Sequence, residues 1–288
     1  MWQITPKNVQ EIAFSSPEYP EAWKAFSDAP ESLYAVGDIS LLKGRKLVVV
    51  GSRRTPAPAL KLGEKICEEL SASLVIVTGV ADGGDSAAIE GALKGSGKVV
   101  CLLAGGFSSL PQGNINLMER VAKRGLLLSP YPFDTPVRKF SYEYRNKLLA
   151  ALGEGTLVLG AAEKSGALIT ARQAWKMKKL VFALPYFPGN ASGAGCNAIL
   201  KAGGIFTETA FDVAKKLGIN LEEKKSAVVL TADEEKMLTA LRELGEGHIT
   251  ELAVKSGVPA FKAKAVLSAL EVKGFCAQLG GNRYAVIE

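Results

Sequence analysis

Six short apolar segments alternate with segments of helical periodicity between residues 46 and 185, and the last part of the chain reads as three helices and a hairpin. Short runs rich in Val, Leu and Ile that alternate with helices are typical of a parallel sheet covered on both faces. We therefore predict an α/β protein with a Rossmann-like, doubly wound, mostly parallel sheet, followed by a small C-terminal winged helix-turn-helix domain.

The predicted strands of the sheet are apolar runs that end in a small or turn-forming residue. They cover residues 46–51, 74–79, 98–105, 125–129, 155–160 and 179–185. A helix that begins at a proline is predicted over about 56–71, and another begins near Gly83. The alternation of strand and helix continues to about Leu217, where we expect the sheet domain to end.

After the sheet, residues 218–230 have the polar, charged middle of a linker. A Thr-Asp cap then opens one helix, and a turn at Ser256-Gly257 separates the next helix from a third that is entered through Pro259. Two short strands around Gly280-Gly281 predict a hairpin. The predicted domains follow from these boundaries: an acidic N-terminal segment 1–40, a Rossmann-like domain 41–220, a linker 221–228 and a winged-helix domain 229–288.

The positive charge of the chain is concentrated in its middle. Residues 41–228 hold 26 basic and 15 acidic residues, net +11, whereas 1–40 hold two and six, net −4, and 229–288 hold seven and eight, net −1. A basic middle suggests a polyanionic partner. A solvated basic surface is the alternative that charge alone leaves open.

Cysteine and histidine are too sparse for several kinds of site. Cys67, Cys101, Cys196 and Cys276 form no C-x-x-C pair, which excludes a zinc ribbon and a dithiol redox site and leaves buried thiols of a reducing compartment. His248 is the only histidine, so we expect no histidine-based catalysis and no histidine metal site. We predict a protein without cofactor or metal.

No segment of the sequence is typical of export or membrane insertion. The N-terminus lacks a basic start followed by an apolar run. The longest stretches without charge, 99–118 and 180–200, are each interrupted by Pro, Asn or Ser. We therefore expect no membrane insertion and a cytoplasmic location.

Ligands of a doubly wound sheet bind at the carboxyl ends of its strands, so the loops there are the candidate sites. The first loop is Gly51-Ser52-Arg53-Arg54. Its glycine permits a tight turn, its serine and amides can donate to a phosphate, and its arginines offer planar forks. Because it is not G-x-G-x-x-G, a dinucleotide site is disfavoured. A tight turn with two exposed arginines is the alternative.

Two further loops have mixed interpretations. In the second, Gly79, Gly83 and Asp85 are predicted to be structural, since glycines allow close approach and Asp85 can cap a helix or fix the loop. Packing against the first loop and direct ligand contact both remain open there. The segment 140–147 interleaves aromatic side chains with Arg, Asn and Lys, a composition typical of single-stranded nucleic-acid binding, although its aromatics could equally pack inside.

The remaining loops lie after the later strands. Ser165 and Gly166 begin a helix, where a hydroxyl and free amides can form an anion seat, unless Ser165 is simply an N-cap. Asn197 closes a loop without charge and could hydrogen-bond a ligand or shape the turn.

Taken in order, these loops resemble the DNA-processing protein A family (DprA, also called Smf), whose members bind single-stranded DNA and load RecA. The matching motifs are Tyr19-Pro20, Leu33-Tyr34-x-x-Gly37, Val50-Gly51-Ser52-Arg53, Thr78-Gly79-Val80-Ala81-x-Gly83-x-Asp85, Pro111-x-x-Asn114, Arg145-Asn146, Ser165-Gly166-Ala167-Leu168-Ile169-Thr170 and Gly195-x-Asn197. The resemblance covers roughly residues 17–210. The chain departs from it at Lys147, where a second Arg is usual, at Gly160, where a Glu is usual, and at Pro130 and Tyr186.

The resemblance implies a protein that binds and protects single-stranded DNA and helps load RecA onto it during DNA uptake, natural transformation and recombination. Single-strand-binding protein would be displaced or would cooperate, and the protein would be a homodimer without enzymatic activity. In that case residues 41–220 form the DNA-binding domain.

The resemblance and the loops together give a set of candidate nucleic-acid-binding residues. These are Gly51, Ser52, Arg53, Arg54, Phe140, Arg145, Asn146, Lys147, Ser165, Gly166, Thr170 and Asn197. The serine of the first loop and the basic residues 53, 145 and 147 would contact phosphates. Thr170 would complete the helix-terminal anion seat, Phe140 would stack on a base, and Asn197 would lie at the rim.

Two other functions are compatible with the fold class. A phosphoribohydrolase-like enzyme would need a P-G-G-x-G-T-x-x-E motif, which the chain lacks, and Gly160 removes the glutamate nearest the loop. A transcription regulator would bind DNA through its winged helix, but the net −1 charge of that region argues against strong phosphate neutralisation.

Overall fold

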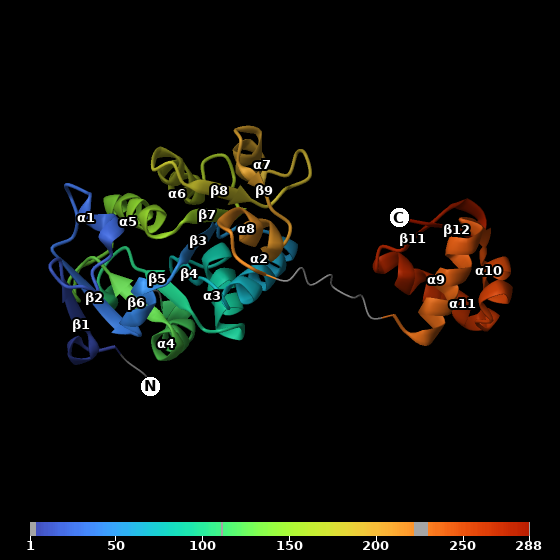
Figure 1. The fold of residues 1–288 in the computed structure, drawn as a ribbon, viewed down its shortest axis with the longest axis horizontal. Helices are drawn as coiled ribbons and strands as arrows, with labels where there is room; N and C mark the ends of the chain where they lie inside the picture. The colour runs from blue at the N-terminus through green and yellow to red at the C-terminus, as the bar shows by residue number, and fades with distance from the viewer. Residues whose placement is uncertain (1–3, 111, 222–229, 288) are drawn as a thin grey trace. The chain divides into compact units, whose positions relative to one another are not determined.

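The computed structural model describes residues 4–110, 112–221 and 230–287, which form two compact units, Met1–Glu222 and Glu223–Glu288. The strands of the first unit are β1 Gln10–Ala13, β2 Ser32–Gly37, β3 Lys46–Gly51, β4 Val75–Thr78, β5 Val99–Leu102, β6 Leu126–Ser129, β7 Gly155–Gly160, β8 Leu180–Ala183 and β9 Ile205–Phe206. They form one sheet in the order β1-β2-β6-β5-β4-β3-β7-β8-β9 (Figure 1). Strands β3 to β9 are parallel, and β1 and β2 are antiparallel at one edge.

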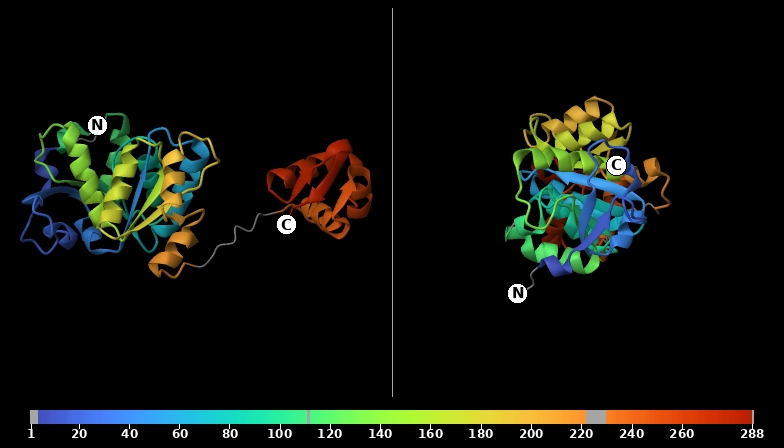
Figure 2. Two further views of the ribbon diagram at one scale, coloured as in Figure 1. Left: turned by 90° about the horizontal axis from the view of Figure 1, so that it is seen from above. Right: turned by 90° about the vertical axis from the view of Figure 1, so that its left-hand side faces the viewer.

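Helices cover both faces of this sheet (Figures 1 and 2). Their bounds are α1 Glu21–Lys24, α2 Ala57–Leu70, α3 Gly84–Lys94, α4 Ile115–Arg124, α5 Lys139–Leu152, α6 Gly166–Lys176, α7 Ala194–Lys201 and α8 Ala210–Leu217. Helices α2, α3, α4 and α8 bury their apolar sides on one face, and α1, α5, α6 and α7 on the other. The predicted α/β class with a mostly parallel sheet is confirmed.

The continuous apolar runs of the central strands follow from burial on both faces. In β3, Leu47 and Val49 pack in one hydrophobic cluster, while Val48 and Val50 pack in the cluster on the opposite face. Because successive side chains of a strand point to opposite faces, a strand covered on both sides needs apolar residues at every position. All six predicted strands are present.

The sheet extends beyond the predicted strands, and the N-terminal segment is part of it. In β2, Leu33 and Ala35 are buried while Tyr34 and Val36 are half-buried, an alternation typical of an antiparallel strand near an edge. The indole of Trp23 is fully buried and donates a hydrogen bond to the Leu148 carbonyl of α5 at 2.9 Å. The predicted division at residue 40 therefore does not follow a boundary in the structure.

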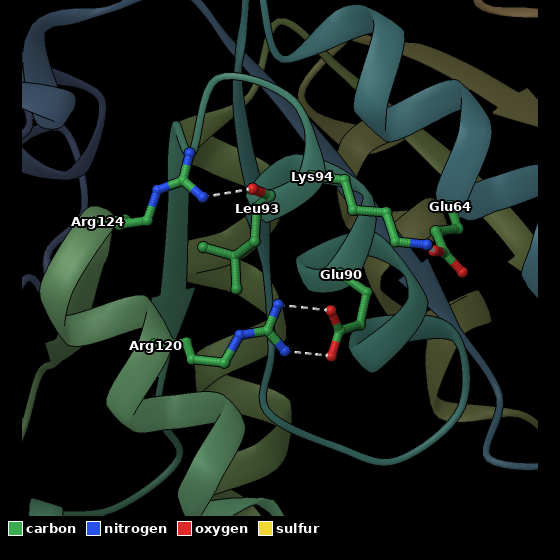
Figure 3. Close-up of polar contacts among 6 residues, drawn as sticks. All are labelled: Glu64, Glu90, Leu93, Lys94, Arg120 and Arg124. Atoms are coloured by element: carbon green, nitrogen blue, oxygen red, sulfur yellow. Dashed lines mark hydrogen bonds and ion pairs between the residues drawn. The ribbon is translucent and has the colours of Figure 1, made fainter.

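Polar contacts join three of the four helices on one face of the sheet, α2, α3 and α4 (Figure 3). Lys94 of α3 pairs with Glu64 of α2. Arg120 of α4 reaches Glu90 of α3 with two parallel hydrogen bonds of 2.7 and 2.9 Å, and Arg124 donates to the Leu93 carbonyl at 2.7 Å. These contacts lie at the helix surface, so they orient the helices more than they stabilise the fold.

The second unit contains α9 Ala232–Leu244, β10 Glu246–His248, α10 Ile249–Ser256, α11 Ala260–Val272, β11 Cys276–Gln278 and β12 Arg283–Val286. Its strands form an antiparallel sheet in the order β10-β12-β11. Thr231 caps α9, as the sequence predicts, and Glu234, which was not predicted to take part, completes a reciprocal capping box; Gly257 in the left-handed conformation (φ 69°) ends α10. Strand β10 was not predicted, because Glu-Gly-His carries no strand pattern. The predicted linker 221–228 lies, apart from residue 221, outside the described residues.

The cysteines and His248 have structural positions in the fold. All four cysteines are buried and free, and His248 accepts a hydrogen bond from the Thr250 amide as the N-cap of α10. Within the described ranges, no group of three or more His, Cys, Asp or Glu side chains could hold a metal ion. No helix among the described residues is both long and apolar enough to cross a membrane.

Candidate functional site

An open pocket of about 440 Å³ lies at the carboxyl ends of β3 and β7, the neighbouring strands at which the order of the sheet reverses. Such a switch point is where ligands bind in open α/β sheets, because the helices leaving the two strands pack on opposite faces. The residues lining this switch-point pocket are Val50, Gly51, Ser52, Arg53, Arg54, Ala81, Asp85, Tyr142, Arg145, Asn146, Ser165, Gly166, Ala167, Ile169 and Thr170. All the predicted nucleic-acid-binding residues line it except Phe140, Lys147 and Asn197.

The first loop is a short turn whose arginines face outward. The Ser52 hydroxyl accepts from the Arg54 amide at 3.1 Å, and Thr55 donates to the Ser52 carbonyl at 2.8 Å. These local bonds are typical of serine and threonine at turns. Arg53 and Arg54 are exposed, and neither makes an ion pair within the described part of the chain. Their guanidinium groups are therefore available to an anion in the pocket.

Two glycines bring the first and second loops into backbone contact. A Cβ on Gly51 would lie 2.7 Å from the Gly84 Cα, and a Cβ on Gly84 would lie 2.3 Å from the Gly51 Cα. Both distances are shorter than real Cβ atoms allow, so neither position accepts a side chain. Gly83 has φ of +82°, a conformation that glycine adopts without strain. The second loop packs on the first, and Asp85 enters the site from α3.

Two buried side chains of opposite charge, Asp85 and Arg145, lie near each other at the pocket, and the described contacts include no direct hydrogen bond between them. The side chain of Asp85 accepts from the Ala81 amide at 3.3 Å, and Arg145 donates to the Leu102 carbonyl at 3.2 Å and to the Asn146 side chain at 3.0 Å. Burial raises the pKa of Asp85, and the charge of Arg145 opposes that rise. A Cβ on Gly79 would lie 2.0 Å from Nη1 of Arg145, so this glycine makes room for the pair.

This pairing changes the role expected for Arg145. Its side chain is only 8% exposed, and its donors are directed to the carbonyl and amide oxygens of the protein interior. Arg145 lines the pocket and lies against Gly79 of the second loop, whereas Arg53 and Arg54 are the exposed cations of the pocket. From the loops and the family resemblance, Arg53 and Arg145 were both expected to contact phosphates.

The N-terminus of α6 also lines the pocket. The Ser165 hydroxyl accepts from the Ala167 amide at 3.3 Å, which is the N-cap role left open by the sequence. A Cβ on Gly166 would meet nothing within 4 Å, so the first turn of α6 is open to the pocket. Amides at the start of an eleven-residue helix attract anions, because they have no partner within the helix.

Helix α5 presents different residues to two different hollows. Tyr142, Arg145 and Asn146 share one side and line the switch-point pocket. Phe140 and Lys147 line a separate hollow, which also includes Asp28 and Tyr144. Tyr142, which the sequence did not single out, is therefore the aromatic residue of the pocket. The sequence could have indicated this, because Tyr142 is three residues from Arg145 and four from Asn146, a spacing that places all three on one side of a helix.

The two remaining predicted residues have partners outside the pocket. Lys147 pairs with Asp28 of the N-terminal segment, and its Nζ lies 4.3 Å from the centroid of the Phe26 ring. Asn197 makes two hydrogen bonds, of 3.0 and 2.9 Å, to the backbone of Tyr186. The geometry of Asn197 is that of a residue that shapes a turn, the second of its two interpretations.

Gly160 and Tyr186, two positions where the sequence departs from the family motifs, are neighbours in space. The Tyr186 hydroxyl donates to the Leu159 carbonyl at 2.6 Å, and a Cβ on Gly160 would lie 2.8 Å from that hydroxyl oxygen and 2.5 Å from Thr55 Oγ1. The space beside Gly160 is thus occupied by Tyr186 and Thr55. A glutamate could not replace Gly160 without moving both side chains.

The fold and the pocket define a class: α/β proteins with an arginine-lined pocket at the switch point of a mostly parallel sheet. Comparison with known proteins narrows that class. The chain belongs to the DNA recombination-mediator protein A family, whose model matches residues 10–218. The family resemblance predicted from the loop motifs is confirmed.

Individual relatives support the same membership. The DNA processing protein DprA of Bacillus subtilis (strain 168) is 36% identical over 213 residues, covering 70% of this chain and 72% of that protein. The Streptococcus pneumoniae protein is 34% identical over 197 residues, covering 68% and 70%.

Solved structures agree in fold. The crystal structure of Streptococcus pneumoniae DprA has a TM-score of 0.69 at 31% identity and covers 73% of this chain and 75% of its own. The structure of DNA processing protein A from Helicobacter pylori, described for its single-stranded-DNA-binding mode, has a TM-score of 0.66 at 31% identity and covers 74% and 97%.

Proposed function

We propose that this protein binds single-stranded DNA in the switch-point pocket and helps load RecA onto that DNA during DNA uptake and recombination. The observation that carries the proposal is the pocket itself, which is lined both by two exposed arginines without a carboxylate partner among the described residues and by the open first turn of α6. Family membership supports the choice of DNA, since a similar structure is described by its single-stranded-DNA-binding mode.

The phosphates of the strand would lie between the first loop and α6. Arg53 and Arg54 can each present a planar fork to phosphate oxygens, and the amides of the first turn of α6 face the same space. Because these groups contact the backbone of DNA and not its bases, binding would depend on salt far more than on sequence.

A base could stack on the aromatic residue of the pocket. Tyr142 is 45% exposed and also lines a narrower slot with apolar walls, formed in part by Val80, Leu103, Leu110 and Val137. Bases prefer aromatic and apolar surfaces beside cationic phosphate sites, as in other proteins that bind single strands. Phe140 lies in the neighbouring hollow, so a strand that crosses the start of α5 would meet it after Tyr142.

The lining of the pocket favours binding over catalysis. Asp85 is the only acidic residue among those lining it, and this carboxyl is buried beside Arg145. A general acid or base needs a carboxyl that can reach the substrate. This supports a binding protein over a phosphoribohydrolase-like enzyme.

We propose that the C-terminal unit is a winged helix-turn-helix and that it is not the main DNA-binding element. Lys255, Lys262, Lys273 and Arg283 each pair with a carboxylate of the same unit at 2.6–3.4 Å. A cation already paired gains less from a phosphate than a free one. RecA, single-strand-binding protein and a second copy of the chain are the partners proposed for the protein as a whole.

The test is a binding titration with the full chain and an unstructured oligonucleotide. Arg53→Ala should weaken binding to every sequence and reduce the slope of log affinity against log salt by about 0.7, the contribution of one phosphate contact on a single strand. Arg120→Ala is the matched control, since it removes the same charge from α4, where Arg120 pairs with Glu90. If both variants bind as the unaltered protein does, the pocket is not the DNA site.

A further inference from the structure

The third helix of the C-terminal unit exposes an apolar stripe where a DNA-reading helix would carry polar side chains. Phe261 is 84% exposed and Val272 is 89% exposed, and the exposed Ala265 and Ser268 lie between them on α11. Positions separated by four, three and four residues share one side of a helix. Two large apolar side chains on one side of one helix are costly to leave in water, which indicates a protein partner.

The stripe has the same pattern in both directions: large, small, small, large. If two copies of α11 meet antiparallel about a two-fold axis, Phe261 of each copy lies against Val272 of the other, and Ala265 lies against Ser268. The small residues at the centre let the helix axes approach closely, while the large residues pack at the two ends. A surface that is complementary to itself in this way is what a two-fold dimer interface requires.

The charges beside the stripe have the same symmetry. Lys264 and Glu271 lie on one flank, and the two-fold places Lys264 of one copy about 3 Å along the axis from Glu271 of the other, given a rise of 1.5 Å per residue. Lys264 is exposed and makes no ion pair within the described residues, and Glu271 is exposed. In a parallel two-fold arrangement, Lys264 and Glu271 of the two copies would lie on opposite flanks of the contact and would not meet.

We propose that the C-terminal unit associates with the same unit of a second copy through the stripe Phe261, Ala265, Ser268 and Val272, with the two α11 helices antiparallel. One helix from each copy buries less than about 1,200 Å², so the contact is weak and reversible. It forms when another interaction, such as a shared DNA strand, brings two copies together.

Cysteine cross-linking of the full chain tests this arrangement. In the variant Ala265→Cys/Ser268→Cys, mild oxidation should give a covalent pair of chains, because the facing Cα atoms come within the reach of about 7 Å that a disulfide requires. The native cysteines are buried, so they add little background. The control is Lys236→Cys/Thr239→Cys, two exposed positions with the same spacing on α9. Equal yields from the two variants would overturn the proposal.

Charge exchange then tests the orientation. In the cross-linking variant, Lys264→Glu should slow disulfide formation by about threefold, because each copy gains a like-charge contact. Adding Glu271→Lys should restore the rate, since the opposite charges again face each other. A double exchange that leaves the rate low would show that the helices do not meet antiparallel, provided that circular dichroism shows the unit folded.

Discussion

The two units of this protein differ in whether the cations relevant to DNA binding are paired with carboxylates. In the first unit, two side chains of opposite charge are buried at a pocket, and the cations at the pocket mouth have no carboxylate partner within the described residues. In the C-terminal unit, four of the cations are held by carboxylates at the surface. The comparison teaches that the net charge of a region says less about polyanion binding than the share of its cations that is free. The net charge of each region predicts that the first unit binds DNA, and the pairing of cations in the C-terminal unit gives a physical reason for the same prediction.

The largest expected effect comes from removing one carboxylate in each unit. Asp85→Asn leaves Arg145 buried without its counter-charge, which should cost about 3–5 kcal/mol of unfolding free energy in the first unit. Asp233→Asn removes the partner of Lys262 at the surface of the C-terminal unit, which should cost at most about 1 kcal/mol.

Urea unfolding followed by tryptophan fluorescence measures the stability of the first variant. All three tryptophans belong to the first unit, so their fluorescence reports on that unit alone. Calorimetry measures the second variant. Asp82→Asn, an exposed position on the same loop as Asp85, controls for the loss of one negative charge. Equal losses for Asp85→Asn and Asp82→Asn would contradict the buried pair.

The next largest effect is expected from the exposed aromatic side chains of the two units, Tyr142 and Phe261. Tyr142→Ala should lower the affinity for single-stranded DNA by about tenfold, since stacking of one base contributes about 1–3 kcal/mol. Phe261→Ala removes an aromatic ring of even greater exposure from the C-terminal unit and should leave unchanged the affinity for an oligonucleotide that holds a single copy. Fluorescence anisotropy with a labelled oligonucleotide measures both. A larger loss from Phe261→Ala would move the DNA site to the C-terminal unit.

Removing the C-terminal unit is expected to have a smaller effect. A chain that lacks residues 226–288 should keep its single-strand affinity within about tenfold, or about 1.4 kcal/mol. The reason is that four cations of that unit are already paired. The same anisotropy measurement applies, and a hundredfold loss from a folded first unit would break the comparison.

The smallest expected effect on DNA affinity concerns Lys147, a predicted phosphate ligand that forms an ion pair with Asp28 at the surface. Asp28→Asn frees Lys147 from its ion pair, so the affinity for single-stranded DNA should rise by about twofold to threefold, within the range of a surface pair. The rise should vanish at high salt, since exposed charges are screened there. Unchanged affinity at low salt would place Lys147 outside the DNA path.

The sequence predicted the sheet and the loops around the pocket because both depend on local patterns. A strand covered on both faces is apolar at every position, and the carboxyl ends of β3 and β7 meet whenever these strands are neighbours. Glycines that bring two backbones together, such as Gly51, are also visible in the sequence.

The direction of the basic side chains on α5 depends on distant residues and was not predictable in the same way. Arg145 points inward because Gly79 leaves space for it and Asp85 offers a charge. Lys147 is held by Asp28, which lies 119 residues earlier in the chain. Strands β1 and β2 were not predicted either, because the first residues are acidic in composition and β2 pairs with β6, which is distant in the sequence.

The antiparallel attachment of β2 to β6 decides where this protein can be shortened. A fragment that begins at residue 41 loses β1 and β2, so the backbone groups of β6 from Leu126 to Ser129 are left without a neighbouring strand. It also loses Trp23, whose indole covers α5. An uncovered apolar sheet edge is a template for pairing with other chains, so such a fragment should aggregate where one that begins before β1 stays dispersed.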